Sequence, residues 1–124
     1  MSSPRLLQAR RERYSWGMHI ITRDDLRDLI DRRAPVTVLE ALPEPYFRKG
    51  HLPGARQFPH DRAAEAAAAM LPDKHAAVVV YCASATCANS HVAAEALSAL
   101  GYTDVRVYVE GKQDWQAAGL PLEL

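Results

Sequence analysis

The chain has no net charge, no long apolar run and very little cysteine. Its 15 Lys and Arg residues balance 15 Asp and Glu residues, so no overall field draws it to nucleic acid or to a membrane surface. No apolar run approaches the roughly 20 residues needed to cross a membrane. The N-terminus also lacks the apolar stretch and cleavage site of a signal peptide. We therefore expect a cytoplasmic protein without nucleic-acid or membrane partners.

Nucleotide and metal motifs are missing as well. Neither G-x-x-x-x-G-K-[ST] nor G-x-G-x-x-G occurs, so nothing supports nucleotide binding. The histidines form no ligand motif, and the two cysteines lack the second pair of a zinc site. We expect no metal and no cofactor. In a reducing compartment the same two cysteines are poor evidence for a structural disulfide, which leaves catalytic or redox use to consider.

The length and the pattern of elements indicate one α/β domain. A chain of 124 residues can form one core but not two. Apolar runs predict strands at 36–40, 55–58, 77–81 and 105–109. Helical spacing predicts helices at 23–33, at 62–70, from about Ser90 and around Trp115. Strands that alternate with helices and are apolar throughout indicate a parallel sheet with helices on both faces.

Local signals refine this pattern. Thr22 and Asp61 are the expected N-caps of the first two long helices. Trp115 is expected to anchor the last helix in the core. The arginine-rich residues 1–17 are expected to form a basic extension, read as a solvated tail, before a domain at 18–124. The helix that begins near Ser90 is expected to bury one face, made of Val92, Ala93, Ala96, Leu97 and Leu100.

The most informative segment is V78-V-V-Y-C-A-S-A-T-C-A-N-S-H91. Cys82 follows the most apolar strand, and ligand sites of open α/β sheets lie beyond the carboxyl ends of the strands. The small residues after Cys82 let main-chain N–H groups converge with the free amides of the next helix, forming an anion-binding nest. Such a nest lowers the pKa of a thiol at its centre and makes that thiol reactive. The alternative is that Cys82 is simply a small buried residue at a strand end.

Cys87 completes a C-x4-C spacing with Cys82. A second thiol at this distance can resolve a persulfide or sulfenate on the first as a disulfide. It can equally be a packing residue in the first turn of the helix. The amides of the loop would hold a charged substrate or a sulfur adduct; the candidate substrate-binding positions are Ala83, Ser84, Ala85, Thr86 and Ala88.

Three segments in order resemble the single-domain rhodanese family, and the resemblance runs from about Ile20 to Leu122. The segment Y46-F-R-K-G-H-L-P-G-A55 is similar to the family's G-H-[IL]-P-G-A motif. The strand that ends at Cys82, with its loop and Ala-rich helix, resembles the active-site segment. The segment V107-Y-V-E-G-K-Q-D-W-Q-A-A-G-L-P121 resembles the closing G-G-x-x-x-W-x-x-x-G-L-P signature.

The resemblance implies a three-layer, five-stranded, mostly parallel sheet with helices on both faces. It also implies that Cys82 is a nucleophile that takes a sulfane sulfur from a donor such as thiosulfate. Rhodaneses carry this sulfur as a persulfide and pass it to a thiophilic acceptor such as cyanide or a thiol.

The sequence departs from the family pattern at several places. Where the family has D-x-R at the end of its second strand, this chain has Glu40-Ala-Leu42, so the arginine is absent. The first glycine of the closing signature is Glu110. The active loop contains no Arg or Lys, which argues against efficient use of the thiosulfate dianion.

The loop is also longer than usual, as in related phosphatases and arsenate reductases with C-x5-R. Here Ala88 stands at the arginine position, so phosphoryl transfer is not expected. The pattern resembles a rhodanese subgroup with C-x4-C in the loop, for which protein or small thiols are the expected acceptors.

Three hypotheses remain open from the sequence. The first is a sulfurtransferase or sulfur carrier that uses Cys82, with thiosulfate or a polysulfide as donor. The second is a redox protein in which Cys82 and Cys87 cycle between dithiol and disulfide. The third is an inactive rhodanese-like domain that binds a partner protein. Lys112 and Arg48 are the nearest candidates to replace the missing loop charge, and His51 is expected to hold loops beside the site.

Overall fold

The computed structural model describes residues 18–124, and the basic extension expected at 1–17 lies outside the described residues. The elements, in chain order, are β1 Met18–Ile20, α2 Arg23–Asp31, β2 Val36–Glu40, α3 Glu44–Arg48, β3 Arg56–Gln57, a 3-10 turn His60–Arg62, α4 Ala63–Met70, β4 Ala77–Tyr81, α5 Asn89–Ala99, β5 Val105–Tyr108 and α6 Gly111–Ala117. The strands expected at 36–40 and 77–81 have the expected bounds.

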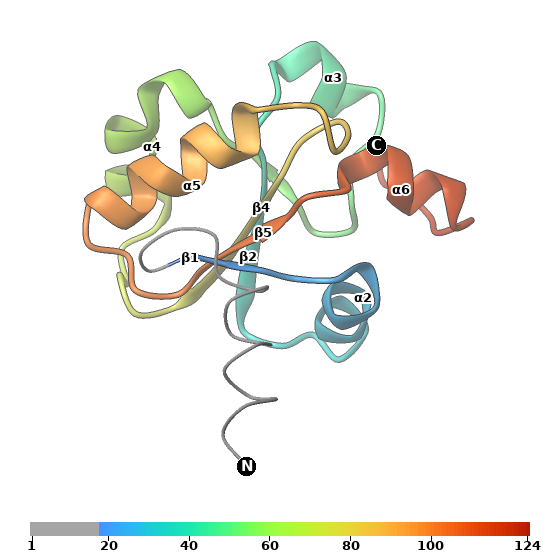
Figure 1. Cartoon of the computed structure of the whole chain (residues 1–124), viewed down its shortest axis with the longest axis horizontal. Helices are drawn as coiled ribbons and strands as arrows, with labels where there is room; N and C mark the ends of the chain where they lie inside the picture. Colours follow the sequence, from blue (N-terminus) through green and yellow to red (C-terminus); the bar gives the residue numbers. More distant parts are fainter. Residues whose placement is uncertain (1–17) are drawn as a thin grey trace.

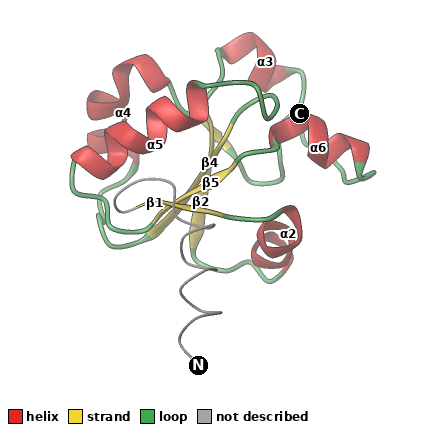
Figure 2. Ribbon diagram, in the orientation of Figure 1, coloured by secondary structure: helices red, strands yellow, loops and turns green. Residues whose placement is uncertain are grey.

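The strands form one five-stranded sheet in the order β1-β5-β4-β2-β3 (Figures 1 and 2). Every strand pair within it is parallel. The sheet is therefore wholly parallel, and the α/β fold class is confirmed. The β4 strand lies at its centre, which explains its continuous apolar sequence because both of its faces are covered.

Two hydrophobic cores lie on opposite faces of the sheet. On one face, α4 and α5 pack against side chains such as Val78 and Val80 of β4. On the other face, α2 and α6 contribute Leu26 and Trp115, which pack with Val79. Figure 1 shows the same division, with α4 and α5 on one side and α2 and α6 on the other. Neighbouring residues of β4 point to opposite faces, as the period of a strand requires.

The start of α2 was predicted correctly and that of α4 was not. Thr22 is the N-cap of α2, and its hydroxyl accepts a hydrogen bond of 3.1 Å from the Asp25 amide. Asp61 is not a cap. It lies inside the 3-10 turn His60–Arg62, and α4 begins one turn later with no side-chain cap. The turn itself satisfies the Arg62 amide, which donates to the Pro59 carbonyl at 3.0 Å.

The buried face of α5 is rotated from the expected one. Ala93 and Leu97 are buried as expected, but Val92 is 47% exposed. The buried face instead contains Ser90 and Ala94. A polar residue therefore takes a core position next to the cysteine loop, and its hydroxyl must find a partner there.

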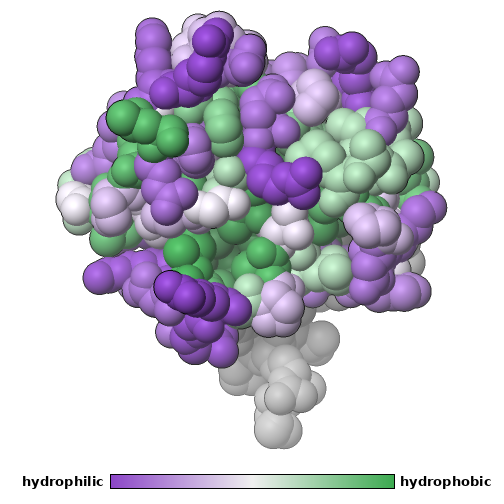
Figure 3. Space-filling model, turned by 180° about the vertical axis from the view of Figure 1, so that it is seen from behind, coloured by the Kyte–Doolittle hydropathy of each residue, from purple (hydrophilic) through white to green (hydrophobic). Residues whose placement is uncertain are grey.

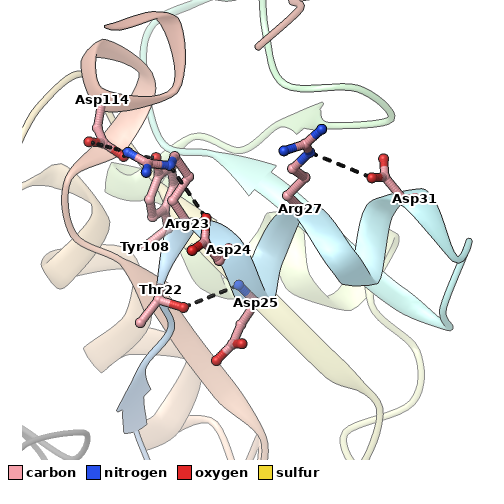
Figure 4. A network of polar contacts seen from close by, with 8 residues as sticks. All are labelled: Thr22, Arg23, Asp24, Asp25, Arg27, Asp31, Tyr108 and Asp114. Carbon is pink, nitrogen blue, oxygen red and sulfur yellow. Dashed lines mark hydrogen bonds and ion pairs between the residues drawn. The ribbon is translucent and has the colours of Figure 1, made fainter. Parts of the chain in front are cut away.

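A polar network fixes α6 against α2 and β5 (Figure 4). One guanidinium nitrogen of Arg23 donates to both carboxylate oxygens of Asp114, at 3.1 and 3.2 Å. The Tyr108 hydroxyl donates to the same carboxylate at 2.5 Å. Trp115, 2% exposed, anchors α6 in the core as expected, and its indole N–H donates to the Pro121 carbonyl at 2.8 Å.

The surface mixes hydrophilic and apolar side chains, as the face seen in Figure 3 illustrates. In the part of the chain that the structure describes, large hydrophobic side chains are exposed only at Tyr46, Val92 and Leu124. Within residues 18–124, none of the helices combines the length and apolarity needed to cross a bilayer.

Candidate active site

The carboxyl ends of three neighbouring strands meet at one edge of the sheet. Glu40, Tyr81 and Tyr108 are in register as the last residues of β2, β4 and β5. Cys82 directly follows Tyr81 and therefore lies at the edge where parallel α/β sheets bind ligands. The loop that begins at Cys82 leads into α5 at Asn89.

The loop is compact, and hydrogen bonds between its own residues hold it together. The Cys87 amide donates to the Ser84 carbonyl at 3.1 Å, which closes a tight turn. The hydroxyls of Ser84 and Thr86 are 3.1 Å apart and hydrogen-bonded to each other. Ala85, Thr86 and Ala88 are exposed, whereas Ala83 and Ser84 are half-buried.

The Cys82 thiol is almost completely enclosed. The residue is 1% exposed, and its sulfur lies 3.4 Å from the Cys87 carbonyl oxygen and 3.3 Å from the Ser90 hydroxyl oxygen. Burial, and next the hydrogen bond to Cys87, raise the pKa of Cys82 above its ordinary value. The hydroxyl and amide of Ser90 act in the opposite direction but do not outweigh them.

The Cys87 thiol is half-buried and receives more hydrogen bonds. Desolvation raises its pKa, but hydrogen bonds from the Cys82 thiol and from the amides of Ala83 and Asn89 outweigh the desolvation. The pKa of Cys87 is therefore lowered. Both cysteines are free thiols, and the Cys82 sulfur lies 3.4 Å from the Cys87 carbonyl oxygen.

The loop thus differs from the nest expected from the sequence. The amides were expected to converge on Cys82 and lower its pKa, and this expectation is wrong for this structure. The amides of Ala83 and Asn89 face Cys87, and the Ser90 amide alone acts on Cys82. The reason is the position of Cys82 directly after the buried strand β4, where the residue is 1% exposed.

The start of α6 holds the loop from behind. The Lys112 amide donates to the Cys82 carbonyl at 2.9 Å, and the Gln113 amide donates to the Ala83 carbonyl at 2.8 Å. In a trans peptide the C=O and N–H groups point in opposite directions. Fixing the Cys82 carbonyl toward α6 therefore turns the Ala83 N–H toward Cys87, where it acts on the thiol.

Gly111 permits this close approach. A Cβ atom at this position would lie 2.5 Å from the Cys82 carbonyl oxygen and 2.9 Å from the Ser84 nitrogen. Its φ of 71° is also in the left-handed region that favours glycine. Both the space and the backbone conformation exclude a side chain here.

A buried carboxylate lies beneath the site. Glu40 is 0% exposed; one of its oxygens accepts from the Tyr81 hydroxyl at 2.6 Å, and the other accepts from the Lys112 ammonium at 3.1 Å. The Tyr81 hydroxyl in turn accepts from the Leu52 amide at 3.1 Å. Burial, together with the Glu40 charge, raises the pKa of Tyr81, so this phenol stays protonated and donates to the carboxylate.

The two cations proposed to replace the missing loop charge are engaged elsewhere. The Lys112 ammonium binds Glu40 and also donates to the Tyr46 carbonyl at 3.1 Å. Arg48 forms an exposed ion pair with Glu44 at 3.8 Å. The contacts made by Lys112 compensate a buried charge, so this lysine supports the site rather than supplying a free cation to it.

His51 holds the surrounding segments together, as expected. Its ring stacks on Phe47 with centroids 3.8 Å apart, and its backbone pairs with Glu123 through hydrogen bonds of 2.8 and 2.7 Å. Among residues 18–124, no group of three or more His, Cys, Asp or Glu side chains is arranged to hold a metal ion.

Sequence reasoning did not identify the roles of Ser90, Lys112 and Glu40 in this site. The sequence contained one signal for Ser90, because a serine stands at the start of the helix that follows the cysteine loop. The Glu40–Lys112 pair joins positions far apart in the chain, and no local spacing indicates it. The pairing of β2 with β4 places Glu40 beside Tyr81, and the hydrogen bond from the Lys112 amide to the Cys82 carbonyl brings Lys112 to the same strand end.

Comparisons with known proteins agree with this geometry. The rhodanese-like domain model matches residues 22–118. An HTH-type transcriptional regulator of Mycobacterium tuberculosis is 30% identical over 98 residues, which cover 77% of this chain and 42% of that protein. The chain therefore spans less than half the length of this curated relative.

Solved structures share the fold. A Bacillus halodurans protein superposes with a TM-score of 0.77 at 21% identity, covering 84% of this chain and 75% of that one. The thiosulfate sulfurtransferase of Pseudomonas aeruginosa superposes with a TM-score of 0.73 at 24% identity, covering 83% of this chain and 19% of that one. With the family match over most of its length, the chain belongs to the rhodanese-like domain family.

Proposed function

We propose that this protein is a sulfane-sulfur carrier that forms a persulfide on Cys82 and passes the sulfur to a thiol. The observation that carries the proposal is the position of Cys82 at the carboxyl end of the central strand, with the Ser90 hydroxyl 3.3 Å from its sulfur. Membership of the rhodanese-like family and the fold shared with a thiosulfate sulfurtransferase support the same chemistry.

The transfer is a pair of displacements at sulfur. In the first, the Cys82 thiolate attacks the sulfane sulfur of the donor, and the donor remnant leaves with the electron pair of the broken bond. In the second, an acceptor thiolate attacks the outer sulfur of the Cys82 persulfide, and Cys82 leaves as a thiolate. The donor is positioned by main-chain amides of the loop, at Ala83, Ser84, Ala85, Thr86 and Ala88.

The C-x4-C loop favours donors of low charge. It contains no Arg or Lys, and Lys112 is already paired with Glu40. Thiosulfate would bring two negative charges to a site whose only neutralising groups are dipoles. We therefore propose a polysulfide or small persulfide as the better donor, and a protein or low-molecular-weight thiol as the acceptor.

A second candidate function is thiol–disulfide exchange. It is favoured by the proximity of the two residues, since the Cys82 sulfur lies 3.4 Å from the Cys87 carbonyl oxygen and a disulfide requires two cysteines that lie close together. In that case the loop would cycle between two thiols and one disulfide, with an external dithiol as the reductant.

Intact mass separates these functions. The reduced protein is incubated with polysulfide and, separately, with thiosulfate, and so is Cys82→Ser. A sulfur carrier gains one sulfur atom that is lost on adding a thiol, and the wild type finishes with this sulfur on Cys82. A redox protein loses two hydrogens. An unchanged mass with both donors would contradict both proposals and leave a binding domain.

Ser90→Ala tests the support given to Cys82. Removing the hydroxyl takes away a group that lowers the pKa of Cys82, so we expect slower loading at neutral pH and recovery of the rate at higher pH. Ser98→Ala on the same helix is the matched control. A loading rate that is equal in Ser90→Ala and wild type across pH would exclude this role.

A further inference from the structure

The two thiols differ in access. Cys82 is 1% exposed and lies behind the loop, whereas Cys87 is half-buried and nearer to solvent. Ala88, next to Cys87, is exposed, as are Ala85 and Thr86. A donor that approaches the loop from solvent therefore meets Cys87 before it can reach Cys82.

The polar contacts also differ between the two sulfurs. Cys87 accepts from the Ala83 and Asn89 amides and from the Cys82 thiol. The Cys82 sulfur instead lies 3.4 Å from the Cys87 carbonyl oxygen and 3.3 Å from the Ser90 hydroxyl oxygen, either of which can accept its proton. The main-chain amides of Ala83 and Asn89 thus act on Cys87, whereas Cys82 has only Ser90 as a donor.

We propose that sulfur enters this protein at Cys87 and is then passed inward to Cys82, so that the two thiols act as a relay. The inference rests on the proposed sulfur-carrier function and adds the path by which Cys82 is loaded. Its basis is the order of exposure of the two cysteines and the position of the Cys82 sulfur, 3.4 Å from the Cys87 carbonyl oxygen.

The first step forms a persulfide on the outer cysteine. The Cys87 thiolate attacks the sulfane sulfur of a polysulfide, a new S–S bond forms, and the bond to the remaining polysulfide breaks. The shortened polysulfide leaves with the electron pair. The product is an anionic Cys87 persulfide, held by the same amides of Ala83 and Asn89 that face the thiolate.

The second step moves the sulfur inward without any external oxidant. The Cys82 sulfur attacks the outer sulfur of the Cys87 persulfide, and the bond from that sulfur to Cys87 breaks. Cys87 leaves with the electron pair of that bond and takes up the proton that Cys82 gives up. One S–S bond forms and one breaks, so the step is neutral in oxidation state.

The contacts favour this direction of transfer. A thiol of lower pKa is the better leaving group in sulfur exchange. The pKa of Cys87 is lowered by its donors, while burial raises that of Cys82. Sulfur therefore leaves Cys87 readily and stays on Cys82 until an acceptor thiol attacks it.

Loading by two donors of different size tests the relay. Wild type, Cys82→Ser and Cys87→Ser are mixed with an inorganic polysulfide or with glutathione persulfide, quenched by alkylation at intervals, and digested to locate the added sulfur. We expect Cys82→Ser to hold the sulfur on Cys87. Cys87→Ser should load Cys82 at least about tenfold more slowly than wild type, a factor that corresponds to about 1.4 kcal/mol, and the bulkier donor should show the larger deficit.

Each other outcome contradicts the relay in a distinct way. If Cys87→Ser loads at the wild-type rate, or Cys82→Ser takes up no sulfur, Cys82 is loaded directly and the proposed function still stands. If wild type releases sulfide and forms a disulfide, Cys87 resolves the persulfide instead of delivering it. If no sulfur is found on either thiol in any protein, the carrier function itself is wrong. If a serine variant fails to fold, the corresponding alanine variant, Cys82→Ala or Cys87→Ala, replaces it. Far-UV circular dichroism checks the fold of each variant.

Discussion

The main-chain amide of Lys112 donates a 2.9 Å hydrogen bond to the carbonyl of Cys82. This contact joins the start of α6 to the first residue of the reactive loop, although the two segments are distant in the chain. It sets the plane of the Cys82–Ala83 peptide and with it the direction of the Ala83 N–H. The chemistry of the thiols therefore depends on a helix that contributes no reacting group.

Gly111→Ala is expected to damage both stability and loading. The new Cβ would lie 2.5 Å from the Cys82 carbonyl oxygen, so the loop and α6 must separate and lose their hydrogen bonds. Gly119→Ala is a matched control, because Gly119 has a φ of 78° with no atom within 4 Å of the added Cβ. We expect the control to cost about 1 kcal/mol from backbone strain alone, and Gly111→Ala to cost at least about 2 kcal/mol more.

Urea unfolding and sulfur-loading rates measure these effects. If the two glycine variants lose equal stability and load sulfur equally fast, the contact between α6 and the loop has no special role.

Lys112→Met is expected to destabilise the protein strongly. It leaves the fully buried Glu40 carboxylate without its cation, and breaking a buried pair in this way costs about 3–5 kcal/mol. Glu40→Gln combined with Lys112→Met should recover much of this loss, since the uncompensated charge is then gone. The measurement is a double-mutant cycle by urea unfolding.

Arg48→Met is the control for that cycle. Arg48 and Glu44 form an exposed pair, with side chains 69% and 68% exposed, so this variant should change stability by less than about 1 kcal/mol. Equal effects of Lys112→Met and Arg48→Met would show that the buried pair contributes no more than a surface one.

The pH dependence of alkylation should differ between the two thiols. The thiolate is the reactive form, and its fraction rises as pH rises through the pKa. Because the pKa of Cys87 is lowered, its reaction with iodoacetamide in Cys82→Ser should begin at a lower pH than for a free cysteine, whose pKa is about 8.5. Because the pKa of Cys82 is raised, its reaction in Cys87→Ser should begin at a higher pH.

Cys82→Ala supplies a further check on the same measurement. Removing the Cys82 S–H deletes a hydrogen bond that lowers the pKa of Cys87, so the alkylation profile of Cys87 should move to higher pH than in Cys82→Ser, where a hydroxyl can still donate. If the pH profile of Cys87 alkylation matched that of free glutathione in both variants, the hydrogen-bond donors of the loop would have no effect on the pKa of Cys87.

Ala88→Arg is expected to change donor preference. Ala88 is exposed beside Cys87, and a guanidinium there would offset part of the thiosulfate charge. An added charge about 4 Å from the dianion is worth roughly 1–4 kcal/mol. We therefore expect kcat/KM for thiosulfate to rise about tenfold or more, with a smaller change for polysulfide.

Added salt should diminish that gain, since exposed charges are screened. Ala88→Gln, of similar length but uncharged, is the control. If Ala88→Gln raised kcat/KM for thiosulfate equally, or if added salt left the gain of Ala88→Arg unchanged, charge would not limit thiosulfate use.

The sequence was sufficient for the fold and for the position of Cys82 directly after the central strand. The apolar run at Ala77–Tyr81 and its neighbours predicted a parallel sheet, which the structure has. Such patterns are local, and burial on both faces of a strand requires them. The same reasoning failed for Asp61, because this residue lies inside a 3-10 turn and α4 begins only after that turn, at Ala63.

The arrangement of the site could not be predicted in the same way. Which sulfur receives the amides depends on the direction of single peptide planes, and these are set by contacts with Lys112 and Gln113. Spacing within the loop contains no information on those contacts. The buried face of α5 was misplaced for a related reason, since Ser90 faces inward to reach Cys82.

The dependence of the loop on α6 also bears on protein synthesis. Cys82 leaves the ribosome before Gly111, Lys112 and Gln113 do, so a nascent chain contains both cysteines while the hydrogen bonds that orient their amides are still missing. Until α6 docks, the two thiols have the reactivity of ordinary cysteines in an unstructured chain. The Ala83 amide is therefore oriented toward Cys87 only in molecules in which α6 has docked, so the lowered pKa of Cys87 is a late product of folding.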